Sequence, residues 1–129
     1  MSATVANQIL LLSQEIAGAV TEIGAEYRID FRDGTSRNAT TAEILAATKA
    51  AAISSNRAEC QRRIYSRYPA WRQSSVALGV LTGPVAEALA AEMRDWISDM
   101  VAAENAAADL IEAAQTVAAV EAVTVAWPV

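Results

Sequence analysis

The sequence contains no histidine and only one cysteine, Cys60, and each scarcity removes a class of function. Without histidine the chain lacks the commonest general base and one of the commonest zinc ligands. A single cysteine cannot form a disulfide within the chain, and it has no histidine partner for nucleophilic catalysis. We therefore expect no catalytic residues, no metal site and no cofactor, and we interpret the protein as a non-enzyme.

Positive charge is missing from the first part of the chain, where the first basic residue is Arg28. A secretory signal combines a positively charged start with an apolar stretch of about 7–15 residues, and the run Ile9–Leu12 is too short for one. Acidic residues or glutamine interrupt the Ala-rich segments before they reach the roughly 20 apolar residues of a membrane span. The sequence thus predicts an unsecreted protein with no membrane partner.

Large side chains are scarce as well, since 7 aromatic residues stand against 30 alanines in a chain of 129 residues. Alanine is the best helix former but buries little area, which favours helices packed closely through small side chains. The length fits one domain. We expect a mainly α-helical fold, an elongated bundle of coiled-coil-like helices with one small β-hairpin.

Apolar residues near the N-terminus recur at alternating spacings of four and three, which is the pattern of a heptad seam. The pattern predicts a helix over residues 1–24 that mediates self-association, with packing inside its own domain as the alternative. The predicted seam consists of Val5, Ile9, Leu12, Ile16, Ala19 and Ile23.

Residues 25–39 carry a different pattern, in which Tyr27, Ile29 and Phe31 alternate with charged residues before Asp33 and Gly34. Alternation followed by Asp-Gly is typical of a β-hairpin. Because a lone hairpin is marginally stable in water, we expect its apolar face to lie on a helix or on a neighbouring chain.

The remainder, residues 40–129, is predicted to be a helical domain. Thr40 and Glu43 have the spacing of a capping box that opens a long helix over about 40–68, and Pro69 ends it. Further helices are expected over about 70–81 and 84–115, followed by a short C-terminal segment that Thr116 can open.

The formal net charge of −5 is distributed unevenly along the chain. Residues 28–79 hold nine of the ten basic residues and a net charge of +5, whereas residues 1–27 carry −3 and residues 80–129 carry −7. We expect the basic middle to pair with the acidic C-terminal helix, within the fold or between subunits.

The basic middle also contains aromatic residues. The predicted basic face consists of Arg57, Arg62, Arg63, Arg67 and Arg72. The predicted interface or packing corner consists of Tyr65, Tyr68, Pro69, Trp71 and Trp96. Mixed cations and aromatics are found in nucleic-acid grooves, but the acidity of the whole chain argues against nucleic acid as a partner. Cys60 is expected to be a small buried side chain.

Three segments resemble a pattern in small tail-associated proteins of tailed bacteriophages, over roughly residues 57–129. These segments are 63–73, which reads RIYSRYPAWRQ, 93–101, which reads MRDWISDMV, and the Trp127-Pro128 pair; Ser74 departs from the asparagine typical of the pattern. The resemblance implies a structural subunit of a phage tail, in the baseplate or fibre-attachment region, that is assembled in the host cytoplasm and retained in the virion. Its partners would be further copies of itself and other tail proteins. The alternatives are a tail-fibre assembly chaperone and a cytosolic helical adaptor or regulator that could bind nucleic acid.

Overall fold

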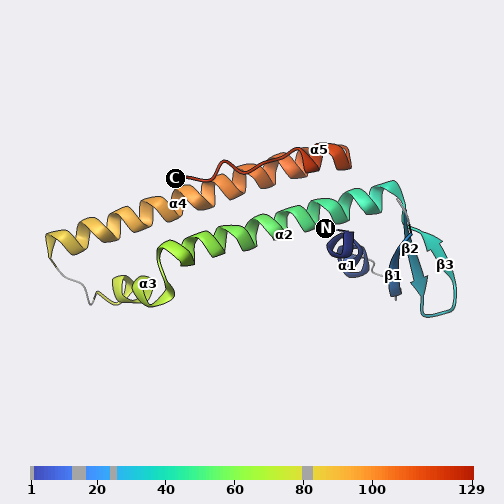
Figure 1. The fold of residues 1–129 in the computed structure, drawn as a ribbon, viewed down its shortest axis with the longest axis horizontal. Helices are drawn as coiled ribbons and strands as arrows, with labels where there is room; N and C mark the ends of the chain where they lie inside the picture. The colour runs from blue at the N-terminus through green and yellow to red at the C-terminus, as the bar shows by residue number, and fades with distance from the viewer. Residues whose placement is uncertain (1, 13–16, 24–25, 80–82) are drawn as a thin grey trace. The chain divides into compact units, whose positions relative to one another are not determined.

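The computed structural model describes residues 2–12, 17–23, 26–79 and 83–129, and the fold is mainly helical with a small antiparallel sheet (Figure 1). The described residues form two compact units, one of 1–54 and 110–123 and the other of 55–109 and 124–129, called unit 1 and unit 2 below. The elements are α1 (Ser2–Leu12), β1 (Ala17–Ile23), β2 (Glu26–Phe31), β3 (Ser36–Asn38), α2 (Thr41–Arg67), α3 (Ala70–Ala77), α4 (Pro84–Ala113) and α5 (Val117–Glu121).

Unit 1 contains a three-stranded sheet in the order β1-β2-β3, with both pairs antiparallel. The predicted hairpin is confirmed as β2 and β3, and Gly34 supplies the positive φ of +90° that its turn requires. Asp33 Oδ1 accepts hydrogen bonds from the Thr35 backbone N–H at 2.9 Å and from its hydroxyl at 2.6 Å, which fixes the turn. The hairpin's apolar face lies on helices of the same chain, as the next contacts show.

The core of unit 1 forms where α1, β2 and α2 meet. Ile9, Ile29 and Ala47 are almost fully buried and contact one another, so each of the three elements contributes one side chain. Partly buried apolar residues surround this cluster: Val5, Val20, Tyr27, Phe31, Ala39 and Ile44. Burial of alternate side chains on β2 is the physical reason for its alternating pattern.

The predicted helix over 1–24 is confirmed for Ser2–Leu12 and wrong for residues 17–23, which form β1, and residues 13–16 lie outside the described residues. The β-branched residues Val20, Thr21 and Ile23 suit a strand, and pairing with β2 places Val20 opposite Ile29. Ala19 and Ile23 therefore lie on a strand, and Ile16 is outside the described residues. Ile9 is buried inside unit 1, so the described seam residues do not form a continuous surface for a partner helix. Self-association through this seam stays a prediction.

The capping box at the start of α2 is confirmed in both directions. The Glu43 backbone N–H donates to the Thr40 hydroxyl at 3.1 Å, and the Thr40 N–H donates to Glu43 Oε1 at 2.9 Å. Arg37 on β3 donates to both carboxylate oxygens of Glu43, at 2.6 and 3.1 Å. One carboxylate thus joins the start of α2 to the hairpin.

We expect Thr40→Ala to lower the free energy of unfolding by about 1 kcal/mol, as loss of an N-cap hydroxyl usually does. Thr41→Ala is the matched control, because Thr41 is the next residue and its side chain is exposed. Urea unfolding followed by circular dichroism measures both changes. Equal losses in the two variants would contradict the assignment of the cap to Thr40.

Hydrogen bonds from Arg37 and Thr40 lower the pKa of Glu43 from 4.5 to about 2. A lowered pKa stabilises the fold above the unfolded value, and this contribution is lost as the pH falls through the folded value. The stability difference between the wild type and Glu43→Gln should therefore shrink as the pH is lowered from about 4.5 to about 2. A difference that is constant over this range would contradict the ionised cap.

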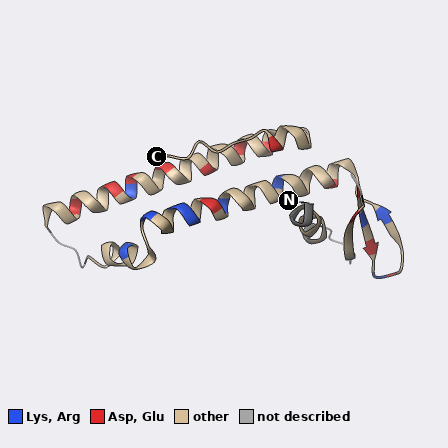
Figure 2. Cartoon of the chain, in the orientation of Figure 1, with Lys and Arg blue, Asp and Glu red and all other residues tan. Residues whose placement is uncertain are grey.

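In unit 2, α2 and α4 lie side by side and run antiparallel. Arg57 pairs with Glu104 at 3.3 Å, and Arg67 pairs with Glu92 at 3.7 Å. From the first pair to the second, the residue number rises along α2 and falls along α4, as it does in antiparallel helices. The predicted pairing of the basic middle with the acidic helix is confirmed within this unit (Figure 2). The buried side chains of unit 2 are Cys60, Tyr68, Met93, Met100 and Ala107.

The remaining helix boundaries agree with the predictions to within a few residues. The helix predicted over 84–115 is α4, and the one predicted over 70–81 is the shorter α3, after which Gly79 adopts a φ of +66°. Thr116 caps α5 by accepting from the Ala119 N–H at 3.1 Å. Residues after α5 are extended, as expected of a β-branched tail.

Candidate interaction site

Pro69 ends α2 and turns the chain into α3. The Tyr68 carbonyl accepts a hydrogen bond from Gln73 Nε2 at 2.7 Å, and the Pro69 carbonyl accepts from the Arg72 and Gln73 N–H groups at 2.9 and 3.1 Å. Proline cannot continue the preceding helix, whereas its fixed φ suits the residue before a new one. The backbone therefore turns at Pro69, as the sequence predicts.

The side chains at this corner form a stack of one cation and two rings. Tyr68, which is 8% exposed, meets Trp96 of α4 edge to face, with ring centroids 5.7 Å apart and planes at 64°. The Arg67 guanidinium lies 4.5 Å from the Trp96 centroid and 5.6 Å from that of Tyr68. Such edge-to-face and cation–π contacts are favourable for partly desolvated rings. Arg67 is thus held between aromatic rings and the carboxylate of Glu92.

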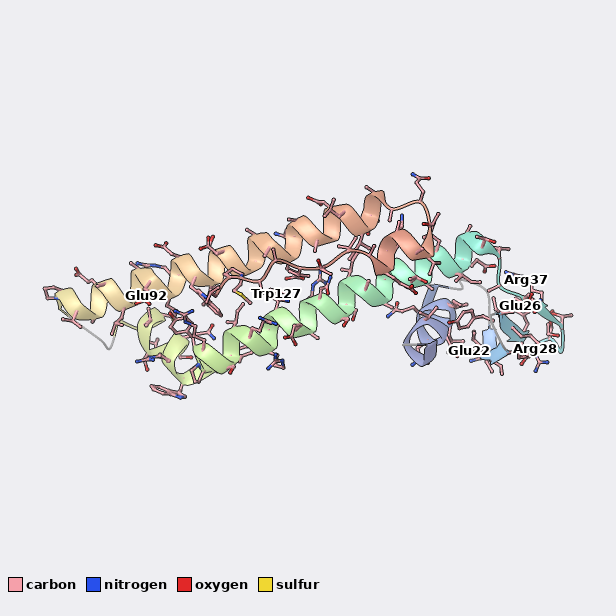
Figure 3. All side chains as sticks on the ribbon, turned by 45° about the horizontal axis from the view of Figure 1, so that its top comes forward. Glu22, Glu26, Arg28, Arg37, Glu92 and Trp127 are labelled. Atoms are coloured by element: carbon pink, nitrogen blue, oxygen red, sulfur yellow. The ribbon has the colours of Figure 1, made fainter. Side chains whose placement is uncertain are left out.

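The extended C-terminal segment of unit 2 returns to the same place (Figure 3). The ring of Trp127 lies 5.1 Å from the Arg63 guanidinium. The Val129 main-chain oxygen accepts from Trp96 Nε1 at 3.3 Å and from Arg67 Nη1 at 3.4 Å. Residues from α2, α4 and the extended segment therefore converge on one cluster, which we call the Arg–Trp cluster: Arg63, Arg67, Tyr68, Trp96 and Trp127.

A hollow open to solvent adjoins the cluster. Its volume is about 330 Å³, and it is lined by Arg62, Arg63, Ser66, Arg67 and Trp96. Arg62 donates to both Glu59 oxygens at 2.8 and 2.6 Å, and Arg63 Nε donates to Glu59 Oε1 at 2.7 Å. These hydrogen bonds lower the pKa of Glu59 to about 2. The ionised carboxylate of Glu59 therefore orients Arg62 and Arg63, two of the three arginines that line the hollow.

The five arginines of the predicted basic face are not equivalent. Arg57, Arg62, Arg63 and Arg67 lie on α2 and each pairs with a glutamate, whereas Arg72 lies on α3 and is exposed. Paired surface charges contribute little stability each, about 0–1 kcal/mol, but they set the orientation of the side chains. The sequence grouped these residues as one face, although the predicted end of the helix at Pro69 already places Arg72 on a different helix from the other four.

Of the five residues of the predicted interface or packing corner, Tyr68 and Trp96 contact each other and Pro69 forms the turn, whereas Tyr65 and Trp71 take no part in buried packing. Trp71 is 68% exposed and Tyr65 is 53% exposed, so neither is a buried anchor. The ring that lies against Tyr68 is that of Trp96, from α4. Two large apolar rings are left facing solvent near the corner.

Cys60 lies on α2 and is 2% exposed, as expected of a small buried side chain. Burial raises the pKa of its thiol, and the negative charge and hydrogen bonding of Glu104 raise it further. A thiol that stays protonated is a weak nucleophile. Among the described residues, no group of three or more histidine, cysteine, aspartate or glutamate side chains is placed to hold a metal ion.

Sequence reasoning missed the place of Trp127 in the cluster. The only local signals were its ring and its neighbour Pro128, and neither predicts which residue an extended segment will contact. It also missed the exposure of two large apolar side chains, Leu78 directly after α3 and Val85 in the first turn of α4, which are 78% and 76% exposed.

Comparisons with models of protein families, with curated proteins and with solved structures find no match. None of the described helices is both long enough and apolar enough to cross a membrane. Any function must therefore be inferred from the residues and their arrangement.

Proposed function

We propose that the chain is a structural subunit of a bacteriophage tail, in the baseplate or fibre-attachment region, and that it acts by packing its helices against other subunits. Assembled in the host cytoplasm, it stays in the virion. The observation that carries the proposal is the convergence of the three segments in the phage-like pattern. Tyr68 of the first segment contacts Trp96 of the second, and Arg63 of the first contacts Trp127 of the third.

This convergence supports the proposal because it gives the pattern a physical meaning. The three segments are far apart in the sequence, but their residues contact one another in one cluster. These contacts account for the residue types in the pattern through packing, without a catalytic role. Next to it lie a positive hollow and exposed apolar rings, which are features of surfaces that bind proteins. A subunit that works by contact requires such surfaces and requires no catalytic group.

Mass spectrometry of purified tailed particles from the source organism tests this role. The expected result is abundant peptides of this chain in intact particles, at a stoichiometry comparable with that of other tail proteins. A phage whose genome lacks the gene should produce particles without complete tails in electron micrographs. Supplying the gene on a plasmid should restore complete tails. If the chain is abundant in the lysate and absent from particles, it is not a structural subunit, and the assembly chaperone becomes the better description.

A further inference from the structure

The hollow beside the Arg–Trp cluster is lined mainly by cations, and we call it the arginine hollow. Its walls are Arg62, Arg63, Ser66 and Arg67 of α2 and Trp96 of α4, and no acidic residue of the described chain lines it. Arg62 and Ser66 are four residues apart, as are Arg63 and Arg67, so these side chains lie on one side of α2. The hollow is open to solvent, and its volume of about 330 Å³ is at the lower end of the range for ligand sites.

Two of these arginines and the serine keep hydrogen-bond donors that this chain does not use. A guanidinium carries several N–H donors in a planar fork. Arg62 donates to Glu59 through Nε and Nη2, and Arg63 donates to it through Nε. None of the described residues accepts a hydrogen bond from Arg62 Nη1, from either Nη of Arg63 or from the Ser66 hydroxyl. These donors are available to an oxyanion from outside the chain.

The charge of the arginine hollow matches a single carboxylate. Glu59 pairs with Arg62 and Arg63. Glu92 pairs with Arg67. Three guanidinium groups and two carboxylates leave one positive charge, which one aspartate or glutamate side chain balances. Hydrogen bonds between a guanidinium and a carboxylate are among the stronger ones in proteins, because both partners are charged.

A nucleic acid fits the arginine hollow less well. Single-stranded nucleic acids stack their bases on aromatic rings. Among the described residues, Trp96 is the one ring that lines the hollow, and it already contacts Arg67 and Tyr68. A nucleic acid also brings a negative charge with every phosphate, and Asp95 and Asp99 are exposed on α4 one and three positions from Trp96. Repulsion by these carboxylates favours a partner with few negative charges.

We propose that the arginine hollow binds an exposed aspartate or glutamate side chain of a partner protein. The carboxylate accepts hydrogen bonds from Arg62, Arg63 and the Ser66 hydroxyl, while Glu59 holds the two guanidinium groups in place. The identity of the partner as a neighbouring tail subunit rests on the proposed function, whereas the binding site itself does not. Binding is tested with the purified chain and the structural role with phage particles, so that either can fail while the other holds.

Titration of the purified full chain with a capped tripeptide, glutamate between two glycines, tests the site. The reporter is the indole N–H resonance of Trp96 in nitrogen–proton correlation NMR spectra, which is assigned by its absence from Trp96→Phe. We expect a saturable shift with a dissociation constant on the order of 1 mM, as a few charge-assisted hydrogen bonds give. The same peptide with glutamine in place of glutamate has nearly the same shape without the charge, and it should give no saturable shift.

Three variants locate the binding. Arg62→Gln removes a charge and several donors from the hollow, and it should raise the dissociation constant about tenfold or more. Arg57→Gln is the matched control, because Arg57 is another arginine of α2 that pairs with a glutamate but does not line the hollow. This control should change the constant less than about twofold, since exposed charges at a distance are screened. Ser66→Ala keeps the charge and should weaken binding about threefold. Circular dichroism checks that all three variants are folded.

Equal effects of Arg62→Gln and Arg57→Gln would mean that the peptide responds to net charge and not to the hollow, and they would overturn the proposal. The absence of a saturable Trp96 shift with the glutamate peptide, or an equal response to the glutamine peptide, would overturn it too. The last arm is an oligothymidylate at the same salt concentration. If it binds more tightly than the peptide and loses its affinity in Arg62→Gln, the hollow is a nucleic-acid site and the proposal is wrong.

Discussion

Replacing Ile29 with alanine is expected to lower the free energy of unfolding by about 2–5 kcal/mol, the range found for large-to-small substitutions in protein cores. Ile29 is 0% exposed and is the strand residue of the cluster that joins α1, β2 and α2. Its removal leaves a cavity between Ile9 and Ala47, and alanine at position 47 cannot fill it. Urea unfolding followed by circular dichroism measures the loss.

Two further variants separate burial from strand propensity. Ile29→Val keeps the branched carbon and most of the volume, so we expect a loss of about 0.5–1.5 kcal/mol. Ile23→Ala removes an isoleucine from the paired strand β1 at a position that is 52% exposed, and it should cost less than about 1 kcal/mol. If Ile23→Ala is as destabilising as Ile29→Ala, the core of unit 1 is not where the structure places it.

Trp96→Ala is expected to lower the free energy of unfolding by about 3 kcal/mol, at the lower end of the range for tryptophan truncation because the ring is only partly buried. Three contacts depend on this side chain: the edge of Tyr68, the guanidinium of Arg67 and the hydrogen bond to the Val129 oxygen. Trp96→Phe retains a ring but removes the N–H donor, and it should cost about 1 kcal/mol.

Trp71→Ala is the natural comparison, since it removes the same side chain a few residues from the same corner. Because Trp71 is 68% exposed, its truncation should cost less than about 1 kcal/mol. A larger loss for Trp71→Ala than for Trp96→Ala would reverse the assignment of the buried ring.

Local chemistry was enough to predict the elements whose ends are fixed by a few neighbouring residues. The Thr40–Glu43 capping box, the Asp33-Gly34 turn and the Pro69 corner all depend on contacts within about five positions, and all three were predicted from the sequence. The long helix α4 followed from a stripe of apolar residues repeated over several turns.

Features decided by distant contacts could not be predicted in the same way. The spacing of Val5 to Ile23 fits a helix, but residues 17–23 pair with β2 as a strand. A third strand stabilises a hairpin that is only marginally stable alone. Likewise, no local signal distinguishes Trp71 from Trp96 as the partner of Tyr68. Alanine makes it harder to distinguish a helix from a strand, because its small side chain fits a heptad seam and is also found in strands such as β1.

The strand β3 is an edge of the sheet formed by the described strands, and edge strands with free backbone groups can recruit further strands from other molecules. Its three residues, Ser36, Arg37 and Asn38, are exposed and polar, and the strand is short. The Arg37–Glu43 ion pair also ties its side chain to α2. This edge is therefore short, polar and tied to α2, and it offers little template for uncontrolled sheet extension and aggregation.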